Sequence, residues 1–256
     1  MIDDRAAIHP DAQIGSDVSI GPFTIVEAGV TIGSGTRVGS HVVIREGTHL
    51  GQDNHIYSFA SIGEDPQFAG YSGENTVLEV GDHNVIREYV TLNRGSPAGT
   101  GTTRIGSHNF LMAYCHIAHD SVLGDHIVFA NGASLAGHVV VGDYAILGGF
   151  TLVHQFCRVG THCLTGIGTV ALKDVAPYVI VAGNPAKTYG VNVRGLRRRG
   201  FGEDQIVELK KTYKEVFRNT ARTNAEPISC NKASPGSSPS AQLLTFAGES
   251  RRGLIR

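Results

Sequence analysis

The sequence predicts a mainly β protein whose chain winds into a parallel β-helix, and two observations support this fold class. An aliphatic residue recurs every six positions, and the 256 residues include 33 glycines but no tryptophan. A period of six matches neither the α-helical nor the heptad repeat, whereas a short strand followed by a turn fits it. The anchors are Ile2, Ile8, Ile14, Ile20, Val26, Ile32, Val38, Ile44, Leu50, Ile56 and Ile62, then Val80, Ile86 and Leu92, then Ile105, Leu111, Ile117, Leu123, Phe129, Leu135, Val141, Leu147, Val153 and Val159.

Three six-residue units are expected to close one triangular coil, with each aliphatic anchor pointing inward. Consecutive coils would stack at the usual strand spacing of about 4.8 Å, so that no coil buries its core alone. The residue four places after the anchor should also point inward, because it is small or β-branched. Examples are Thr36, Val42, Ala60, Ser121, Ala133 and Val139.

The repeat suggests two regions. Residues 1–190 are expected to form the hexapeptide-repeat β-helix, with loops leaving it at 64–76 and 93–103, where Gly, Ser, Thr and Pro replace the pattern. Residues 191–256 are expected to form a small C-terminal α-helical region. Within it, residues 202–219 carry apolar residues at helical spacing, whereas 223–242 are rich in Ser, Pro, Ala and Asn and are expected to be partly irregular.

Net charge and composition indicate which kinds of partner and which cellular location to expect. A formal net charge of -1 disfavours a nucleic-acid-binding protein, which usually carries a basic excess. The N-terminus lacks a secretion signal, and no apolar run is long enough to insert into a membrane, so a cytoplasmic location is expected. The four cysteines lack CxxC spacing, which favours reduced thiols. We expect no cofactor and no metal.

The six-residue repeat gathers polar residues on one face. Residues 18 apart should be neighbours on adjacent coils, which places His119 beside Gly137 and Gln155, and Asp120 beside His138. His154 would continue the column of Ala118 and Ala136, and His116 would lie at the corner that leads into this face. A histidine close to a carboxylate can act as a general base near neutral pH.

The Gly137 amide could complement such a base. Because glycine lacks a side chain, a substrate carbonyl could approach this backbone N–H, which would stabilise the oxyanion of an acyl transfer to a hydroxyl. Cys115 is a poor covalent nucleophile because it occupies an inward position. Two alternatives remain at this point: a histidine ladder that is solvated or packed in a trimer, and a zinc site formed by His116, His119 and His138.

Several motifs are similar to those of the UDP-N-acetylglucosamine O-acyltransferases. They are His116-Ile-Ala-His119-Asp120, Leu135-Ala-Gly137-His138-Val, Val153-His154-Gln155-Phe156-Cys157, Gly190-Val-Asn192-Val, Gly195-Leu-Arg-Arg-Arg-Gly-Phe201 and Arg252-Gly-Leu-Ile-Arg256. The resemblance runs from Met1 to about Phe201 and resumes at the C-terminus. It implies a left-handed parallel β-helix, a homotrimer and active sites between neighbouring subunits.

The same resemblance implies roles for individual residues. His119 would activate the glucosamine 3-hydroxyl, Asp120 would orient His119, and the Gly137 amide would face the thioester carbonyl. The residues implied to bind the sugar nucleotide, the acyl chain, the phosphates or the carrier protein are His116, His138, His154, Gln155, Gln67, Asn192, Arg198 and Arg199.

The implied acyl donor is a 3-hydroxyacyl chain on acyl carrier protein, and the implied acceptor is UDP-N-acetylglucosamine, as in the first step of lipid A biosynthesis. Acyl carrier protein is acidic, and Arg194 with residues 197–199 offers a basic patch for it, although such a patch could equally be the solvated start of a helix.

The sequence departs from the family at two places. Phe68 and Gly70 stand where the family usually carries an aspartate and a lysine that reach the substrate, although Gln67 is retained. Ile167 stands at the position that limits acyl length, where long-chain enzymes have glycine. We expect Ile167 to shorten the acyl pocket, although ordinary packing is the other interpretation.

Three other functions remain as alternatives. A zinc-dependent β-helical hydratase of the carbonic anhydrase type would need bound metal. An acyltransferase that acts on the 2-amine would usually carry a further N-terminal uridine-binding domain, whereas the repeat here begins at Ile2. A non-catalytic scaffold would give no reason for the clustering of His119, Asp120 and Gly137.

Overall fold

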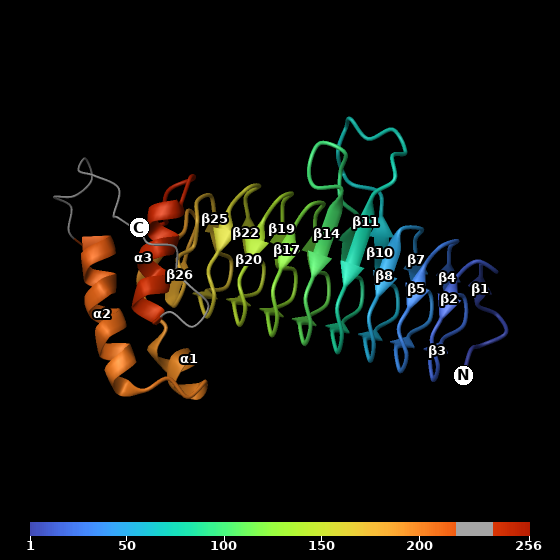
Figure 1. Cartoon of the computed structure of the whole chain (residues 1–256), viewed down its shortest axis with the longest axis horizontal. Coiled ribbons are helices and arrows are strands. Elements are labelled where there is room, and N and C mark those ends of the chain that lie inside the picture. The colour runs from blue at the N-terminus through green and yellow to red at the C-terminus, as the bar shows by residue number, and fades with distance from the viewer. Residues whose placement is uncertain (219–237) are drawn as a thin grey trace.

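The computed structural model describes residues 1–218 and 238–256. Short strands wind into a three-sided prism with a helical cap at its C-terminal end (Figure 1). Within the prism successive strands join the first, second and third sheet in turn, and every pairing between coils is parallel. The predicted parallel β-helix is therefore present.

The first sheet is formed by β1 (Ala7–Ile8), β4 (Ile25–Val26), β7 (Val43–Ile44), β10 (Ser61–Glu64), β13 (Thr91–Asn93), β16 (His116–Ile117), β19 (Ser134–Leu135), β22 (Leu152–Val153) and β25 (Val170–Ala171). The second is formed by β2 (Gln13–Ile14), β5 (Thr31–Ile32), β8 (Thr48–Leu50), β11 (Val77–Val80), β14 (Thr102–Ile105), β17 (Val122–Leu123), β20 (Val140–Val141) and β23 (Arg158–Val159). The third is formed by β3 (Ser19–Ile20), β6 (Arg37–Val38), β9 (His55–Ile56), β12 (Val85–Ile86), β15 (Phe110–Leu111), β18 (Val128–Phe129), β21 (Ile146–Leu147), β24 (Leu164–Thr165), β26 (Val179–Ala182) and β27 (Lys187–Val191).

The register follows from the six-residue repeat. His116 pairs with Ser134 and Ser134 with Leu152, so residues 18 apart are neighbours in this part of the prism. Most of the aliphatic anchors, including Ile117 and Leu135, are almost completely buried. The six residues expected to point inward four places after an anchor, Thr36, Val42, Ala60, Ser121, Ala133 and Val139, are buried as well. Stacking the coils therefore builds one continuous apolar core.

Two loops leave the prism on the same side (Figure 1). The first connects β10 to β11 through residues 65–76, and the second connects β13 to β14 through residues 94–101. Pairing resumes after each loop, since Ser61 pairs with Thr91 and Thr91 with His116. Both loops therefore insert into the coils without changing the position of the next strand in its sheet.

The C-terminal cap begins where β27 pairs antiparallel with β26. The cap contains helices α1 (Val193–Arg198), α2 (Glu203–Arg218) and α3 (Pro239–Glu249). Ile206 and Leu209 are buried, as the apolar spacing of α2 predicts. No helix in the described residues is long and apolar enough to cross a bilayer.

Part of the stretch expected to be irregular is helical. Residues 223–237 lie outside the described residues, but 239–242 form the first turn of α3. The Ser238 hydroxyl caps this helix by accepting a hydrogen bond from the Ala241 N–H, and Pro239 occupies its first turn. A serine before the first turn and a proline within it both favour the start of a helix.

Candidate active site

The predicted cluster lies at the corner between the first and second sheets. Asp120, His138 and Phe156 occupy equivalent corner positions on three consecutive coils, with φ angles of 59°, 60° and 63°. Their side chains therefore leave the prism at the same edge. The His138 ring stacks on Phe156 at 4.5 Å, and the His119 ring meets His138 edge-on at 5.1 Å.

His119 and Asp120 form a buried pair. His119 Nδ1 lies 2.8 Å from Asp120 Oδ2, with side-chain exposures of 13% and 0%. Because a carboxylate only accepts hydrogen bonds, it favours the neutral imidazole tautomer that carries its proton on Nδ1. The lone pair of Nε2 is then available to accept a proton from a substrate hydroxyl.

The loop of residues 94–101 surrounds the Asp120 carboxylate. Oδ2 accepts hydrogen bonds from the Ser96 N–H at 3.0 Å and the Ser96 hydroxyl at 2.6 Å. Oδ1 accepts from the Thr100 N–H at 2.9 Å, the Thr100 hydroxyl at 3.2 Å and the Gly101 N–H at 3.2 Å. Burial by itself raises the pKa of Asp120, but the bonds from Ser96 and His119 outweigh it, so that the pKa is lowered and the carboxylate stays ionised.

Two further histidines face this pair. His116 Nδ1 bonds to the Thr91 hydroxyl at 2.7 Å, and burial, followed by the nearby His119, lowers the pKa of His116. His138 Nε2 lies 3.9 Å from Asp120 Oδ2, and burial is the main cause that lowers the pKa of His138. Both histidines therefore favour the neutral form. The sequence predicted His116 at the corner, but the structure places it on strand β16 itself.

Gly137 lies directly against the His119 ring. A β-carbon at residue 137 would be 2.6 Å from His119 Cε1 and 2.8 Å from Nε2, so this position leaves no space for a side chain. The Gly137 carbonyl accepts a hydrogen bond from the Phe156 N–H at 3.1 Å, but in the described part of the chain no acceptor binds the Gly137 N–H. This amide is therefore available to a ligand.

A metal would have to compete with these hydrogen bonds. His119, Asp120 and His138 could each offer one ligand atom, and those atoms lie within 4.8 Å of one another. His116, which belonged to the zinc set considered from the sequence, is absent from this group and bonds instead to Thr91. A carboxylate offers about four lone-pair sites. Three donors already reach each oxygen of Asp120, so the donor set fits a metal ligand poorly.

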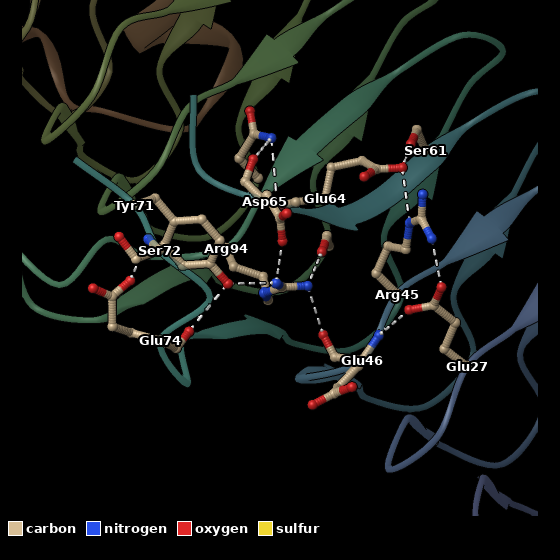
Figure 2. A network of polar contacts seen from close by, with 12 residues as sticks. Glu27, Arg45, Glu46, Ser61, Glu64, Asp65, Tyr71, Ser72, Glu74 and Arg94 are labelled. Carbon is tan, nitrogen blue, oxygen red and sulfur yellow. Dashed lines mark hydrogen bonds and ion pairs between the residues drawn. The ribbon is translucent and has the colours of Figure 1, made fainter. Parts of the chain in front are cut away.

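The loop of residues 65–76 borders the cluster. The Phe68 ring lies 6.2 Å from the His119 ring and is tilted by 52°. Figure 2 shows how Arg94, buried at 9% exposure, holds this loop. Its guanidinium bonds to the Asp65 carboxylate, the Tyr71 hydroxyl at 3.0 Å, and the carbonyls of Gly63 and Glu46 at 2.8 and 3.0 Å.

The same side of the prism carries a second ion-pair network, also seen in Figure 2. Arg45 bonds to Glu27 at 2.5 Å and to Glu64 at 3.0 Å, which ties three successive coils of the first sheet together. Arg45 is 42% exposed, so this pair adds little to stability. The buried Arg94 network is the more important of the two for placing the loop.

Other predicted residues lie farther from the pair. His154 and Gln155 are exposed on the next coil, where His154 Nδ1 lies 3.2 Å from the Gln155 carbonyl oxygen and 3.3 Å from Arg252 Nη2. Gln67 is exposed on the loop that carries Phe68. Ile167 is 78% exposed within one chain.

Asn192, Arg198 and Arg199 lie away from His119 within one chain. Asn192 caps α1: its side-chain oxygen accepts from the Gly195 N–H at 3.1 Å, and its amide donates to the His162 carbonyl at 3.0 Å. Arg199 packs over the Tyr144 ring at 4.1 Å, at the corner between the second and third sheets. A single chain therefore does not bring these residues to the His119 corner.

Cys115 lies inside the prism, as predicted. It is fully buried, and burial raises the pKa of its thiol to about 11. A neutral, enclosed thiol is a poor nucleophile. The described cysteines Cys115, Cys157 and Cys163 are all buried and unpaired.

Three residues of the site were not predicted from the sequence: Ser96 and Thr100, which hold Asp120, and Thr91, which binds His116. Ser96 and Thr100 lie in a segment without the six-residue repeat, so no stacking rule could assign them a neighbour. The only available signal was that this loop, rich in Gly, Ser and Thr, rejoins the prism one coil before His119.

Three segments of the chain match models of known protein families. Residues 11–46 and 102–137 match the family described as bacterial transferase hexapeptide (six repeats). Residues 174–255 match the family described as Udp N-acetylglucosamine O-acyltransferase; Domain 2. The fold and the site thus define a transferase of the hexapeptide-repeat class.

Individual relatives specify the family. The chain is 50% identical over 254 residues to the acyl-[acyl-carrier-protein]--UDP-N-acetylglucosamine O-acyltransferase of Thiobacillus denitrificans, covering 98% of this chain and 97% of the relative. It is 50% identical over 253 residues to the enzyme of the same name from Halorhodospira halophila, covering 98% of each. The solved LpxA from Acinetobacter baumannii is 43% identical, with a TM-score of 0.91 and coverage of 100% and 99%.

The chain belongs to the UDP-N-acetylglucosamine O-acyltransferase family. These relatives also confirm the predicted left-handed parallel β-helix.

Proposed function

We propose that this enzyme transfers a 3-hydroxyacyl chain from acyl carrier protein to the glucosamine 3-hydroxyl of UDP-N-acetylglucosamine, the first step of lipid A biosynthesis. The names of its relatives support the donor and the acceptor. The observation that carries the chemistry is the His119–Asp120 pair, whose imidazole packs directly against Gly137.

The proposed reaction begins when His119 Nε2 removes the proton of the 3-hydroxyl as its oxygen attacks the thioester carbonyl. The Gly137 N–H then donates to the developing oxyanion. Collapse of the tetrahedral intermediate breaks the carbon–sulfur bond, and the departing thiolate takes its proton from His119. Asp120 stays ionised and orients the imidazole throughout.

We place the remaining substrate contacts at subunit boundaries. Within one chain Asn192, Arg198 and Arg199 lie away from the His119 corner, so a homotrimer would let a neighbouring copy supply them. In this arrangement His116, His138, His154, Gln155 and Gln67 bind the sugar nucleotide or the acyl chain, and Ile167 limits the acyl length. The basic residues of α1 would bind acyl carrier protein. The buried free thiols agree with a cytoplasmic location, because thiols stay reduced in that compartment.

A zinc-dependent hydratase is the alternative function. It is disfavoured by the hydrogen bonds that occupy both oxygens of Asp120. Elemental analysis of the purified protein would test it directly, because a hydratase of this type needs stoichiometric metal.

Incubation of the purified protein with UDP-N-acetylglucosamine and a series of 3-hydroxyacyl carrier protein thioesters tests the proposal. We expect an ester at the glucosamine 3-position, detected by mass spectrometry, together with one equivalent of free carrier thiol. A product acylated on nitrogen, or thioester consumption without sugar acylation, would contradict it. Omitting the sugar nucleotide controls for simple thioester hydrolysis.

A further inference from the structure

The carboxylate of Asp120 is bound by a segment that lies about twenty residues earlier in the chain. Ser96, Thr100 and Gly101 supply five of the hydrogen-bond donors described above, and His119 supplies the sixth. The Asp120 N–H in turn donates to the Thr103 hydroxyl at 2.8 Å. Residues 96–101 therefore hold the Asp120 side chain, and Thr103 holds its backbone N–H.

The fit of this turn around the carboxylate is close. A β-carbon on Gly99 would lie 2.4–2.5 Å from the carboxylate carbon and both oxygens of Asp120, so only glycine allows the chain to pass here. Ser96 is fully buried, and the Asp120 side chain has no exposed surface. Water therefore has no direct access to replace a donor that is lost.

The two carboxylate oxygens have different partners. Oδ2 receives the Ser96 N–H, the Ser96 hydroxyl and His119 Nδ1, whereas Oδ1 receives only donors from Thr100 and Gly101. Ser96 and His119 thus share one oxygen atom. A change at Ser96 acts directly on the acceptor that holds the imidazole, whereas a change at Thr100 acts on the other oxygen.

We infer that the turn of residues 96–101 is a positioning device for the reaction, in which the Ser96 hydroxyl fixes Asp120 so that His119 presents Nε2 to the acceptor hydroxyl. This inference rests on the proposed role of His119 as general base. Sharing the negative charge among several donors also limits how strongly Asp120 attracts a proton onto His119. Ser96 is therefore a positioning residue that touches neither substrate.

The pH dependence of the rate can report this role. Removing the Ser96 hydroxyl leaves more of the negative charge on Oδ2, which favours a positive charge on the adjacent imidazole. The other titratable groups that face the pair are His116 and His138, and both favour the neutral form. The base must be neutral to act, so the acidic limb of the profile should move to higher pH.

The test is the pH profile of kcat/KM for Ser96→Ala. We expect the maximal rate to fall roughly 10- to 100-fold, as for the loss of other groups that orient a functional histidine. We also expect the acidic limb to rise by about 0.5–1 pH unit, and KM for UDP-N-acetylglucosamine to change little. Ser96→Thr, which restores a hydroxyl, should recover most of the rate.

Two further variants serve as controls. Ser121→Ala removes a buried hydroxyl next to Asp120 that donates to the Ala136 carbonyl at 3.4 Å, and it should leave the profile unchanged. Thr100→Val removes a donor to Oδ1 and should move the acidic limb less than Ser96→Ala. If Ser96→Ala does not fold, the smaller shift expected for Thr100→Val still tests the inference. An equal loss of rate at every pH, with no shift of the limb in either variant, would overturn it.

A second readout separates this inference from the proposed function. In ¹⁵N-histidine-labelled protein, the neutral His119 ring should show the tautomer protonated at Nδ1 in both wild type and Ser96→Ala, but its ring resonances should broaden in Ser96→Ala because the carboxylate is held less firmly. Ring resonances that are as sharp in Ser96→Ala as in the wild type would refute the positioning role. A His119→Ala variant that retained full activity would instead refute the general-base role, whatever the tautomer.

Discussion

Gly137 and the His119 imidazole are packed so closely that a β-carbon at 137 would lie 2.6 Å from His119 Cε1. The two residues are 18 apart in sequence and lie on adjacent coils, as the pairing of β16 with β19 requires. The stacking of two neighbouring coils therefore brings together a candidate base and the Gly137 N–H, which no acceptor among residues 1–218 and 238–256 binds.

This contact predicts that Gly137→Ala displaces the His119 ring without unfolding the prism. Gly137 does not adopt a left-handed backbone conformation, so alanine is tolerated by the backbone but not by the imidazole. We expect kcat to fall by 10²-fold or more, the order of magnitude for loss of an oxyanion donor or a misplaced base. Gly202→Ala is the matched control, because its β-carbon would meet nothing closer than 3.7 Å. A fully active Gly137→Ala enzyme would contradict this role.

The six-residue repeat explains how much of this site the sequence could predict. The repeat determines which residues share a face of the prism. The proximity of His119 to Gly137 and of Asp120 to His138 was therefore predictable, because residues 18 apart lie on adjacent coils. The loops carry no repeat, and their paths depend on individual side-chain hydrogen bonds. Ser96 and Arg94 could not be assigned partners because the residues that bind them lie at sequence separations that no period determines.

Arg94 is expected to stabilise both loops. Arg94→Met would leave the buried Gly63 carbonyl and the partly buried Glu46 carbonyl without this donor, and should lower the free energy of unfolding by about 2–4 kcal/mol. Amide hydrogen exchange in residues 65–76 should become faster. Arg104→Met is the control, because its ion pair with Glu79 is exposed and should contribute less than about 1 kcal/mol. Both variants should be measured by chemical denaturation at one protein concentration, and equal losses would count against the anchoring role.

His162 should make stability depend on pH. Burial, followed by the nearby Arg199, lowers its pKa from 6.5 to about 4, so the folded protein favours the neutral ring. Between these pH values the unfolded chain binds more protons than the folded one. Stability should therefore fall as the pH decreases from about 6.5 to about 4. His162→Phe should reduce the slope of the free energy of unfolding against pH, measured by chemical denaturation between about pH 4 and pH 6.5. The stability of the same variant at pH 8 provides the reference. An unchanged slope would show that other groups cause the effect.

Ile167 should determine which acyl chains the enzyme accepts. Ile167→Gly removes an exposed apolar side chain and should favour donors longer by two methylenes, by about 15-fold in relative kcat/KM, since each CH₂ buried contributes about 0.8 kcal/mol. Competition between two acyl carrier protein thioesters in one reaction measures this ratio. Val207→Ala, which shortens another exposed side chain on α2, should leave the ratio unchanged. If Ile167→Gly keeps the same preference, Ile167 does not limit chain length.

The most direct test of the central claim is the rate of acyl transfer by His119→Ala with UDP-N-acetylglucosamine and the preferred acyl carrier protein thioester. His49→Ala, an exposed histidine on β8 that bonds to Thr31, is the control and should remain fully active. If His119 is the general base, His119→Ala should be slower by roughly 10²–10⁴-fold while its melting temperature stays close to that of the wild type. Turnover near the wild-type rate would contradict the account.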